Sequence, residues 1–393
     1  MDRLDVAEPV ITLTSGPVDA YPAVLRALSR TVHYDFDPYF QAVYQRVSEK
    51  AGKALKQDRP ATILQGEPVL GLEAAAASLI AKDDVVLNLA SGVYGKGFGY
   101  WAARYAKEVD EIEVPYDEAI DPEAVRRKLA ERPEIGIVAV CHHDTPSGTI
   151  NPVAEIGRIC AEHGALTIVD AVSSWGGMDV HPDAIHADIF VTGPNKCLGG
   201  TPGLTILGIS DKAWAKMEAN PDAPFASILS ITDWREAWSR DKPFPFTPSV
   251  AEVNGMDAAL DQYFAEGPEA VWARHALTAR ACRAGIKAMG LSLWAKDEAI
   301  ASDTTTAVRV PDGMEDAEIR ATARRLYGVV FSAGRAETLG RLIRIGHMGP
   351  TAHPIYAVAA LTALGGALRA LGHPVDVGAG VEAAMAVVAE AGC

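Results

Sequence analysis

The stretch LTIVDAVSSWGGMDVHPDAIHADIFVTGPNKCLGG, residues 166–200, decides the fold class. It contains two short apolar runs, 166–169 and 189–191, and both runs stop at polar or glycine residues. Apolar, β-branched runs of this length predict strands that are buried on both faces of a parallel sheet. In such sheets the ligand lies beyond the carboxyl ends of the strands, so Asp170 and Lys196 are expected beside a binding site.

Strand and helix patterns alternate on the N-terminal side of this stretch. The spacing from Val140 to Val169 fits one strand–helix–strand unit. The predicted strands are 62–64, 85–89 and 137–140, and the predicted helices are 20–30, 40–56, 69–80 and 154–163. This alternation predicts an α/β domain over residues 19–265, preceded by an irregular arm, residues 1–18.

The pattern changes after about residue 265. A long helix at 268–289 is followed by shorter elements, with strands at 304–310, 327–332 and 342–346 and helices at 315–326 and 355–370. The sequence therefore predicts a smaller C-terminal α+β domain, residues 266–393.

Composition excludes several classes of protein. The chain has 393 residues, 36 Lys plus Arg against 51 Asp plus Glu, and a net charge of −15. An acidic chain without a basic tract is a poor binder of nucleic acid and of anionic membranes. Its five cysteines are scattered without metal-ligand spacing, so neither a disulfide framework nor a metal site is expected. The first residues do not resemble a signal peptide, so we expect a cytoplasmic protein.

Lys196 and Asp170 suggest the chemistry. A lysine that follows a buried strand can be desolvated, which lowers its pKa and frees its amine to form an imine or move a proton. The alternative for Lys196 is a surface loop lysine, and the alternative for Asp170 is a helix cap. The separation from Asp170 to Lys196 fits one further strand–helix–strand step, so adjacent strands could present both side chains into one crevice. The pair then suits pyridoxal chemistry, in which the acid binds the ring nitrogen and the lysine forms an imine with the aldehyde.

Two other strand ends carry residues that fit such a site. Tyr94 follows the strand at 85–89 and could stack on an aromatic ring, or it could simply cover a helix end. Thr145 follows the strand at 137–140 and offers a hydroxyl, although a turn residue is the plainer interpretation. Three arginines, Arg335, Arg341 and Arg344, also stand within ten residues of an otherwise acidic chain.

Several motifs together resemble the fold-type I aminotransferases of the alanine–glyoxylate/serine–pyruvate branch. They are Ser15-Gly16-Pro17, the segment from His142 to Gly148, Val169-Asp170-Ala171, Lys196 with Pro202-Gly203, and Leu342-Ile-Arg344-Ile-Gly346. The resemblance covers nearly the whole chain and implies a large domain with a mixed, mostly parallel sheet between helices. It also implies an active site between two subunits, and so a homo-oligomer, with a homodimer as the minimum and a homotetramer as the larger form.

The resemblance assigns a role to each candidate residue. Lys196 would be the imine lysine, Asp170 the partner of the ring nitrogen, and Tyr94 the stacking aromatic. Thr145 would lie near the phenolic oxygen of the ring. Arg344 would bind the carboxylate of the amino or keto acid, with Arg335 as a second guanidinium.

The turn that holds the cofactor phosphate in this family differs here. It reads Gln65-Gly66-Glu67-Pro68, so Glu67 adds a negative charge and Pro68 has no N–H to donate. A second phosphate contact in the family, a Tyr-x-x-Thr segment, reads Phe244-Pro-Phe-Thr247. The alternative for Glu67 is an acid stabilised by the helix dipole.

With these departures, the sequence resembles the pyridoxamine–pyruvate aminotransferases within the branch. The expectation is transamination between pyridoxamine and pyruvate, giving pyridoxal and L-alanine, in vitamin B6 degradation. The free vitamin would be a substrate, bound near Glu67 and through a Lys196 Schiff base, with no cofactor and no metal. The alternatives are a pyridoxal-phosphate-dependent aminotransferase of the same branch and a catalytically silent protein that senses vitamin B6.

Overall fold

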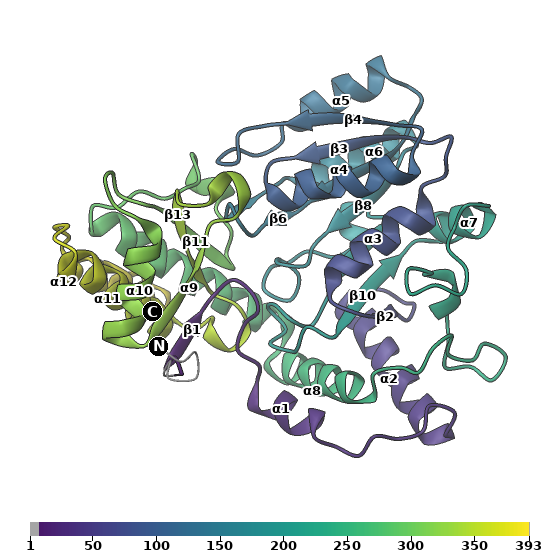
Figure 1. The fold of residues 1–393 in the computed structure, drawn as a ribbon, viewed down its shortest axis with the longest axis horizontal. Helices are drawn as coiled ribbons and strands as arrows, with labels where there is room; N and C mark the ends of the chain where they lie inside the picture. The colour runs from purple at the N-terminus through teal and green to yellow at the C-terminus, as the bar shows by residue number, and fades with distance from the viewer. Residues whose placement is uncertain (1–7, 393) are drawn as a thin grey trace, which may run out of the picture.

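The computed structural model describes residues 8–392 and contains a seven-stranded and a four-stranded sheet, each with its own buried core (Figure 1). The larger sheet has seven strands in the order β2-β10-β9-β8-β5-β3-β4. In that order the strands are β2 (Thr62–Gln65), β10 (Leu204–Ile209), β9 (Ile189–Thr192), β8 (Leu166–Asp170), β5 (Ile135–Cys141), β3 (Val85–Ala90) and β4 (Glu108–Glu113). Only β10 runs antiparallel to its neighbours, so the expected mixed, mostly parallel sheet is confirmed.

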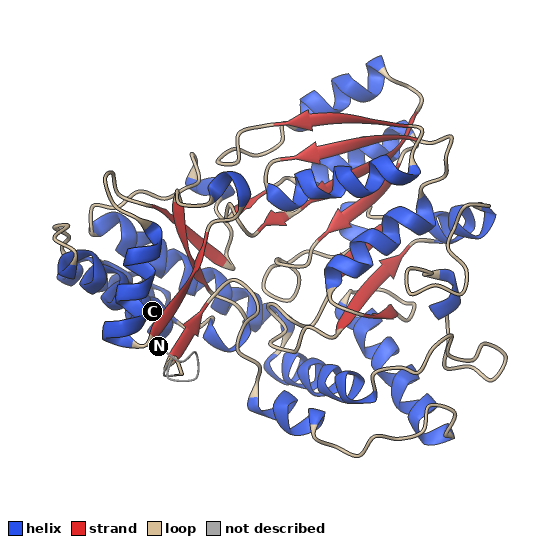
Figure 2. Cartoon of the chain, viewed as in Figure 1, coloured by secondary structure: helices blue, strands red, loops and turns tan. Residues whose placement is uncertain are grey.

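Helices surround the larger sheet because its inner strands are largely apolar and buried. Strands β3 and β10 are buried at every position, and Figure 2 shows the strands lying among helices. The helices of this part are α1 (Pro22–Leu28), α2 (Pro38–Ala54), α3 (Pro68–Leu79), α4 (Val93–Tyr105), α5 (Pro122–Glu131), α6 (Val153–His163), α7 (Asp211–Ala219) and α8 (Val250–Glu266). A two-stranded hairpin, β6 (His143–Asp144) with β7 (Thr149–Ile150), follows β5 at the carboxyl edge.

The smaller sheet has the strand order β1-β12-β13-β11 and lies on the left of Figure 1. Its strands are β1 (Ile11–Leu13), β12 (Val329–Ala333), β13 (Leu342–Gly346) and β11 (Thr305–Arg309). It packs with α9 (Pro268–Ala288), α10 (Asp316–Tyr327), α11 (Pro354–Ala370) and α12 (Val377–Ala391).

Strand β1 corrects part of the expected irregular arm. Residues 1–7 of that arm lie outside the described residues, but Ile11–Leu13 pairs in parallel with residues 329–331 of β12. The reason is burial, because Leu13 is fully buried in the small core. The chain then continues to α1, which packs on α8 of the large domain. The domain boundaries 1–18, 19–265 and 266–393 stay predictions.

The connection from β8 to β9 also differs from expectation. The two strands are adjacent and parallel, as the positions of Asp170 and Lys196 require. However, the segment between them contains only a short 3₁₀ turn, Asp183–Ile185, where a strand–helix–strand step was expected. Gly176, Gly177 and Pro182 explain the absence of a longer helix in this segment.

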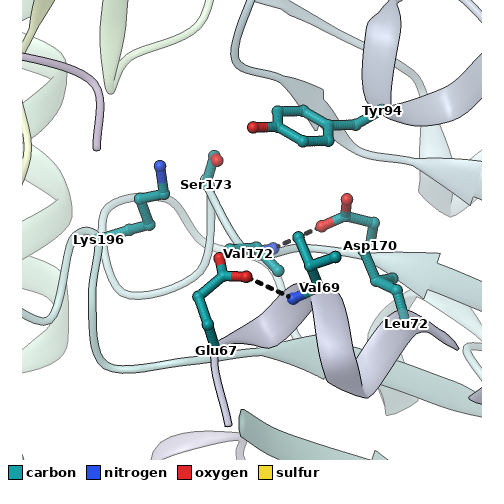
Figure 3. Close-up of a pocket in the computed structure, with 8 residues that line it drawn as sticks. All are labelled: Glu67, Val69, Leu72, Tyr94, Asp170, Val172, Ser173 and Lys196. Carbon is teal, nitrogen blue, oxygen red and sulfur yellow. Dashed lines mark hydrogen bonds between the residues drawn. The ribbon is translucent and has the colours of Figure 1, made fainter. Parts of the chain in front are cut away.

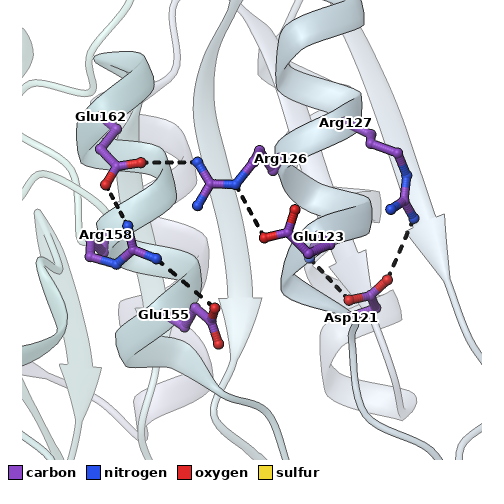
Figure 4. Close-up of polar contacts among 7 residues, drawn as sticks. All are labelled: Asp121, Glu123, Arg126, Arg127, Glu155, Arg158 and Glu162. Atoms are coloured by element: carbon purple, nitrogen blue, oxygen red, sulfur yellow. Dashed lines mark hydrogen bonds and ion pairs between the residues drawn. The ribbon is translucent and has the colours of Figure 1, made fainter.

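Ion pairs join α5 and α6 on the surface (Figure 4). Arg126 contacts Glu162 of α6 at 3.0 Å, and Arg158 contacts the same carboxylate within its own helix. These side chains are exposed, so each pair contributes about 0–1 kcal/mol to stability. None of the helices in residues 8–392 is long and apolar enough to cross a membrane.

Candidate active site

A pocket opens at the carboxyl edge of the large sheet, where the strand-end rule places it. Eight residues line it: Glu67, Val69, Leu72, Tyr94, Asp170, Val172, Ser173 and Lys196 (Figure 3). Glu67 precedes α3, Tyr94 stands in the first turn of α4, Asp170 ends β8, and Lys196 follows β9. The fold therefore brings four sequence-predicted site residues from four chain segments into one pocket.

Lys196 is held by the N-terminal segment of the chain. Its Nζ donates a hydrogen bond to the Ser15 carbonyl oxygen at 2.6 Å. Burial and the nearby Arg344 charge lower the pKa of Lys196 to about 8. About a tenth of the amine is therefore neutral at pH 7, and a neutral amine is the form that attacks a carbonyl or accepts a proton.

Asp170 presents one carboxylate oxygen to the pocket side of β8. Its Oδ1 accepts from the Val172 N–H at 2.9 Å, and its Oδ2 accepts from the Cys141 thiol at 3.6 Å. Burial raises the pKa of Asp170 to about 6. The carboxylate is thus mostly ionised at neutral pH and can pair with a protonated ring nitrogen.

Tyr94 forms the opposite wall and contacts one of the crowded arginines. Nη1 of Arg335 donates to the Tyr94 Oη at 3.3 Å, and the guanidinium carbon lies 5.8 Å from the ring centroid. Burial raises the pKa of Tyr94, while the Arg335 and Arg344 charges lower it. Figure 3 shows the ring of Tyr94 facing the space between Asp170 and Lys196.

The other two arginines of this cluster, Arg344 and Arg341, have different neighbours. Arg344 Nε donates to the Ala333 carbonyl at 2.7 Å, and burial lowers the pKa of Arg344 to about 10. Arg341 instead lies over the ring of Trp294, 4.9 Å from its centroid. Arg335 and Arg344 are therefore near Tyr94, whereas Arg341 belongs to a different surface.

Thr145 is buried one layer behind the pocket and does not line it. It shares a 2.5 Å hydrogen bond with the hydroxyl of Ser173, which does line the pocket. Sequence reasoning did not single out Ser173 as a site residue. The available signal was its place three residues beyond the end of β8.

Glu67 caps a helix and lines the pocket at the same time. It is the N-cap of α3, where its Oε2 accepts from the Val69 N–H at 3.0 Å, and Pro68 follows it. The helix-start interpretation of Glu67 is thus observed, and Figure 3 shows the same carboxylate in the pocket. Phe244 is buried against Phe40 and Tyr44, so in this chain its ring is part of the core.

In sequence and in fold, the chain is similar to known aminotransferases. The aminotransferase class-V model matches residues 99–349. A pyridoxamine–pyruvate transaminase of Mesorhizobium japonicum is 68% identical over 97% of both chains. The crystal structure of pyridoxamine–pyruvate aminotransferase from Mesorhizobium loti superposes with a TM-score of 0.97, at 68% identity and 98% coverage of both chains. The crystal structure of ureidoglycine–glyoxylate aminotransferase from Bacillus subtilis superposes with a TM-score of 0.91 at 28% identity. The match covers 98% of this chain and 99% of that chain.

The class-V match shows that the expectation of no cofactor is wrong. Class-V aminotransferases depend on pyridoxal phosphate, so a bound pyridoxal phosphate is expected at this site. The residues fit the ring of that group, because the buried carboxylate of Asp170, the low-pKa amine of Lys196 and the ring of Tyr94 surround one pocket. These three residues would hold the ring, which supplies an electron sink for amino-group transfer.

Proposed function

This chain belongs to the class-V aminotransferase family, and on that premise we propose that it transfers an amino group between pyridoxamine and pyruvate, giving pyridoxal and L-alanine. The observation that carries the proposal is the 68% identity, over 97% of both chains, to a protein named for that reaction. The site supports it with a desolvated lysine, a buried carboxylate and a stacking aromatic around one pocket.

Each pocket residue has a part in binding pyridoxamine. We place the pyridine ring of pyridoxamine in the position that would also hold the ring of pyridoxal phosphate, against Tyr94 and with its nitrogen on Asp170. Its phenolic oxygen then points toward Ser173, which is hydrogen-bonded to Thr145. The hydroxymethyl group then lies at Glu67, whose Oε2 already accepts from its own helix, so Oε1 is left to accept from a hydroxyl. An ionised acceptor makes a stronger hydrogen bond than a neutral one.

Pyruvate is placed by its carboxylate. Arg344 is the proposed anchor because a guanidinium can bind a carboxylate through two parallel hydrogen bonds. Arg335, which contacts the Tyr94 hydroxyl, is the second cation at this end of the site. The Arg344 charge also favours the neutral form of Lys196.

Lys196 moves the proton in this scheme. Pyridoxamine and pyruvate first condense to an imine with loss of water. As a neutral amine, Lys196 removes a proton from the C4′ carbon of this imine and returns it to the carbon derived from pyruvate, first as general base and then as general acid. Lys196 Nζ then displaces L-alanine from C4′, and water hydrolyses the resulting Schiff base to release pyridoxal and the free lysine. Holding both reactants in this geometry supplies a large part of the rate acceleration.

Replacement of Lys196 tests the proposal. In Lys196→Ala, turnover of pyridoxamine and pyruvate should be nearly abolished while pyridoxamine still binds, because the ring contacts remain. Lys212→Ala, at an exposed position on α7, is the matched control and should retain normal activity. Full activity of Lys196→Ala would contradict the proposed role of Lys196.

A second candidate is a pyridoxal-phosphate-dependent aminotransferase of the alanine–glyoxylate/serine–pyruvate type, which the class-V match favours. The two candidates differ in the pair of substrates that is turned over. Parallel assays then compare pyridoxamine plus pyruvate with alanine plus glyoxylate. Turnover of the second pair alone would favour the second candidate.

The biological setting is part of the proposal. We propose that the reaction belongs to vitamin B6 degradation, because free pyridoxamine would be the amino donor. A homodimer is the smallest assembly proposed, with a homotetramer as the larger form, and the proposed location is the cytoplasm. Light scattering of the purified chain measures its assembly.

A further inference from the structure

Asp144 is a fully buried carboxylate that has no part in the scheme above. It ends β6, one residue before Thr145. Its Oδ1 accepts from the Val93 N–H at 3.1 Å, and its Oδ2 accepts from the N–H groups of Tyr94 at 2.8 Å and Gly95 at 3.1 Å. Three backbone donors thus converge on one side chain.

These donors are the free N–H groups at the start of α4, which have no partner within the helix. The N-cap residue of α4 is Gly92, which has no side chain to bind them. Asp144 therefore supplies the cap from a segment about 50 residues further along the chain. Its negative charge also suits the positive end of the helix.

The same residue connects two sides of the pocket. Asp144 binds the backbone N–H of Tyr94, the proposed stacking residue. Through the chain it is joined to Thr145, which shares a hydrogen bond with Ser173 of the pocket wall. The place of Asp144 thus sets the distance between the Tyr94 ring and the Thr145–Ser173 pair.

We propose that Asp144 is a positioning residue that fixes Tyr94 relative to Thr145 and so sets the affinity of the pocket for a pyridine ring. The identity of that ring as pyridoxal or pyridoxamine rests on the proposed function. A cap without this role would stabilise α4 and leave the ring affinity of the folded protein unchanged.

Gly92 gives an independent way to displace Asp144. A Cβ built on Gly92 would lie 2.1 Å from Asp144 Cγ and 2.4 Å from both carboxylate oxygens, which are the three nearest atoms. The φ of Gly92 is 178°, an extended value that alanine also adopts. Gly92→Ala therefore acts by pushing the Asp144 carboxylate away.

The experiment measures the affinity for pyridoxal by absorbance titration in Asp144→Asn, Gly92→Ala, Asp144→Ala and the double variant Gly92→Ala/Asp144→Ala. We expect each single variant to weaken pyridoxal binding by about tenfold or more. Asp144→Asn replaces the acceptor of the Val93 N–H by an amide NH₂, Asp144→Ala removes all three hydrogen bonds, and Gly92→Ala displaces the carboxylate that accepts them. Adding Gly92→Ala to Asp144→Ala should weaken pyridoxal binding little further, because the carboxylate atoms that would clash with the new Cβ are already absent. The KM for pyruvate should change less than twofold.

Asp121→Asn is the matched control, since Asp121 caps the exposed helix α5 through the Glu123 N–H (Figure 4). It should leave the affinity for pyridoxal unchanged. If Asp144→Asn and Gly92→Ala lower only the unfolding midpoint and leave that affinity within twofold, the inference is overturned. Should Asp144→Ala fail to fold, these two variants alone decide. Normal pyridoxal binding by a wild-type protein that does not turn over pyridoxamine and pyruvate would refute the proposed function only.

Discussion

The charge state of Lys196 sets the pH at which the proposed reaction can run. Burial and Arg344 lower the pKa of this amine to about 8, so the reactive neutral form grows tenfold per pH unit below that value. We expect kcat/KM for pyruvate to rise from pH 6 and level off above about pH 8. The measurement is a pH–rate profile in buffers of constant ionic strength. A flat profile from pH 6 to 9 would contradict the assignment of Lys196 as the base.

Gly16 lies against the same amine. A Cβ on Gly16 would stand 1.7 Å from Lys196 Nζ, and the φ of Gly16 is +129°, where alanine is strained. Gly16→Ala should therefore displace Lys196 and reduce kcat by at least about a hundredfold, since small misplacements of reacting groups have effects of that size. Gly136→Ala, whose Cβ meets no atom within 4 Å, is the control. Equal activity of both variants would show that Lys196 does not depend on this contact.

The Glu67 carboxylate should discriminate between the forms of vitamin B6. Two negative charges a few Å apart in a partly desolvated site repel by a few kcal/mol, or about 100-fold in affinity. Glu67→Gln keeps an acceptor for the Val69 N–H and removes the charge. We expect the affinity for pyridoxal phosphate to rise relative to that for pyridoxal, measured by absorbance titration of both ligands. An unchanged ratio would place the phosphate away from Glu67.

At the residue level, strand ends were the informative signal. The rule that ligands lie beyond the carboxyl ends of parallel strands was enough to predict that Tyr94, Asp170 and Lys196 would come together. Asp144 and Ser173 were missed because their importance depends on hydrogen bonds between segments distant in sequence. The roles of all site residues stay predictions.

At the level of elements, apolar runs predicted strands well and polar or glycine-rich elements poorly. β3, β5, β8 and β9 were found because they are buried on both faces. β4 (EVDEIE) lies at the edge of the sheet and is partly exposed. Its charged residues leave no apolar run, so the sequence did not predict this strand. α4 contains three glycines among its thirteen residues, and tertiary packing overrides their low helix propensity.

The contact between α3 and β10 makes a testable case of such packing. A Cβ on Gly71 of α3 would lie 2.2 Å from Thr205 Cγ2 of β10. Gly71→Ala should therefore destabilise the protein by about 1–3 kcal/mol, as overpacking of a core does. Thr205→Ser removes that methyl group and should recover part of the loss in the double variant. Urea unfolding of the four proteins measures the coupling, and strictly additive effects would contradict the proposed clash.

At the scale of the whole molecule, a buried polar network joins the two domains. His143 lies within hydrogen-bond distance of Thr304 Oγ1 at 3.0 Å, and Thr304 donates to the Ser173 carbonyl in the pocket wall. His347 Nε2 shares a hydrogen bond with Thr306. No sequence pattern predicted this network, because its members lie far apart in the sequence. It connects the small domain to the pocket through neutral side chains.

Those neutral histidines make the fold sensitive to acid. Burial lowers the pKa of His142 to about 4 and the pKa values of His143, His275 and His347 to about 3, against about 6.5 in an unfolded chain. Below pH 6.5 the unfolded state therefore binds up to four protons that the folded state excludes. Asp144 and Asp170, whose pKa values burial raises to about 7 and 6, offset about two of these. Near pH 5 the net difference of about two protons should lower the free energy of unfolding by about 3 kcal/mol per pH unit. Urea unfolding at pH 7, 6 and 5 measures this slope, His347→Asn should make it shallower by about one proton, and a midpoint that does not move between pH 6.5 and 5 would show that these histidines are not held neutral.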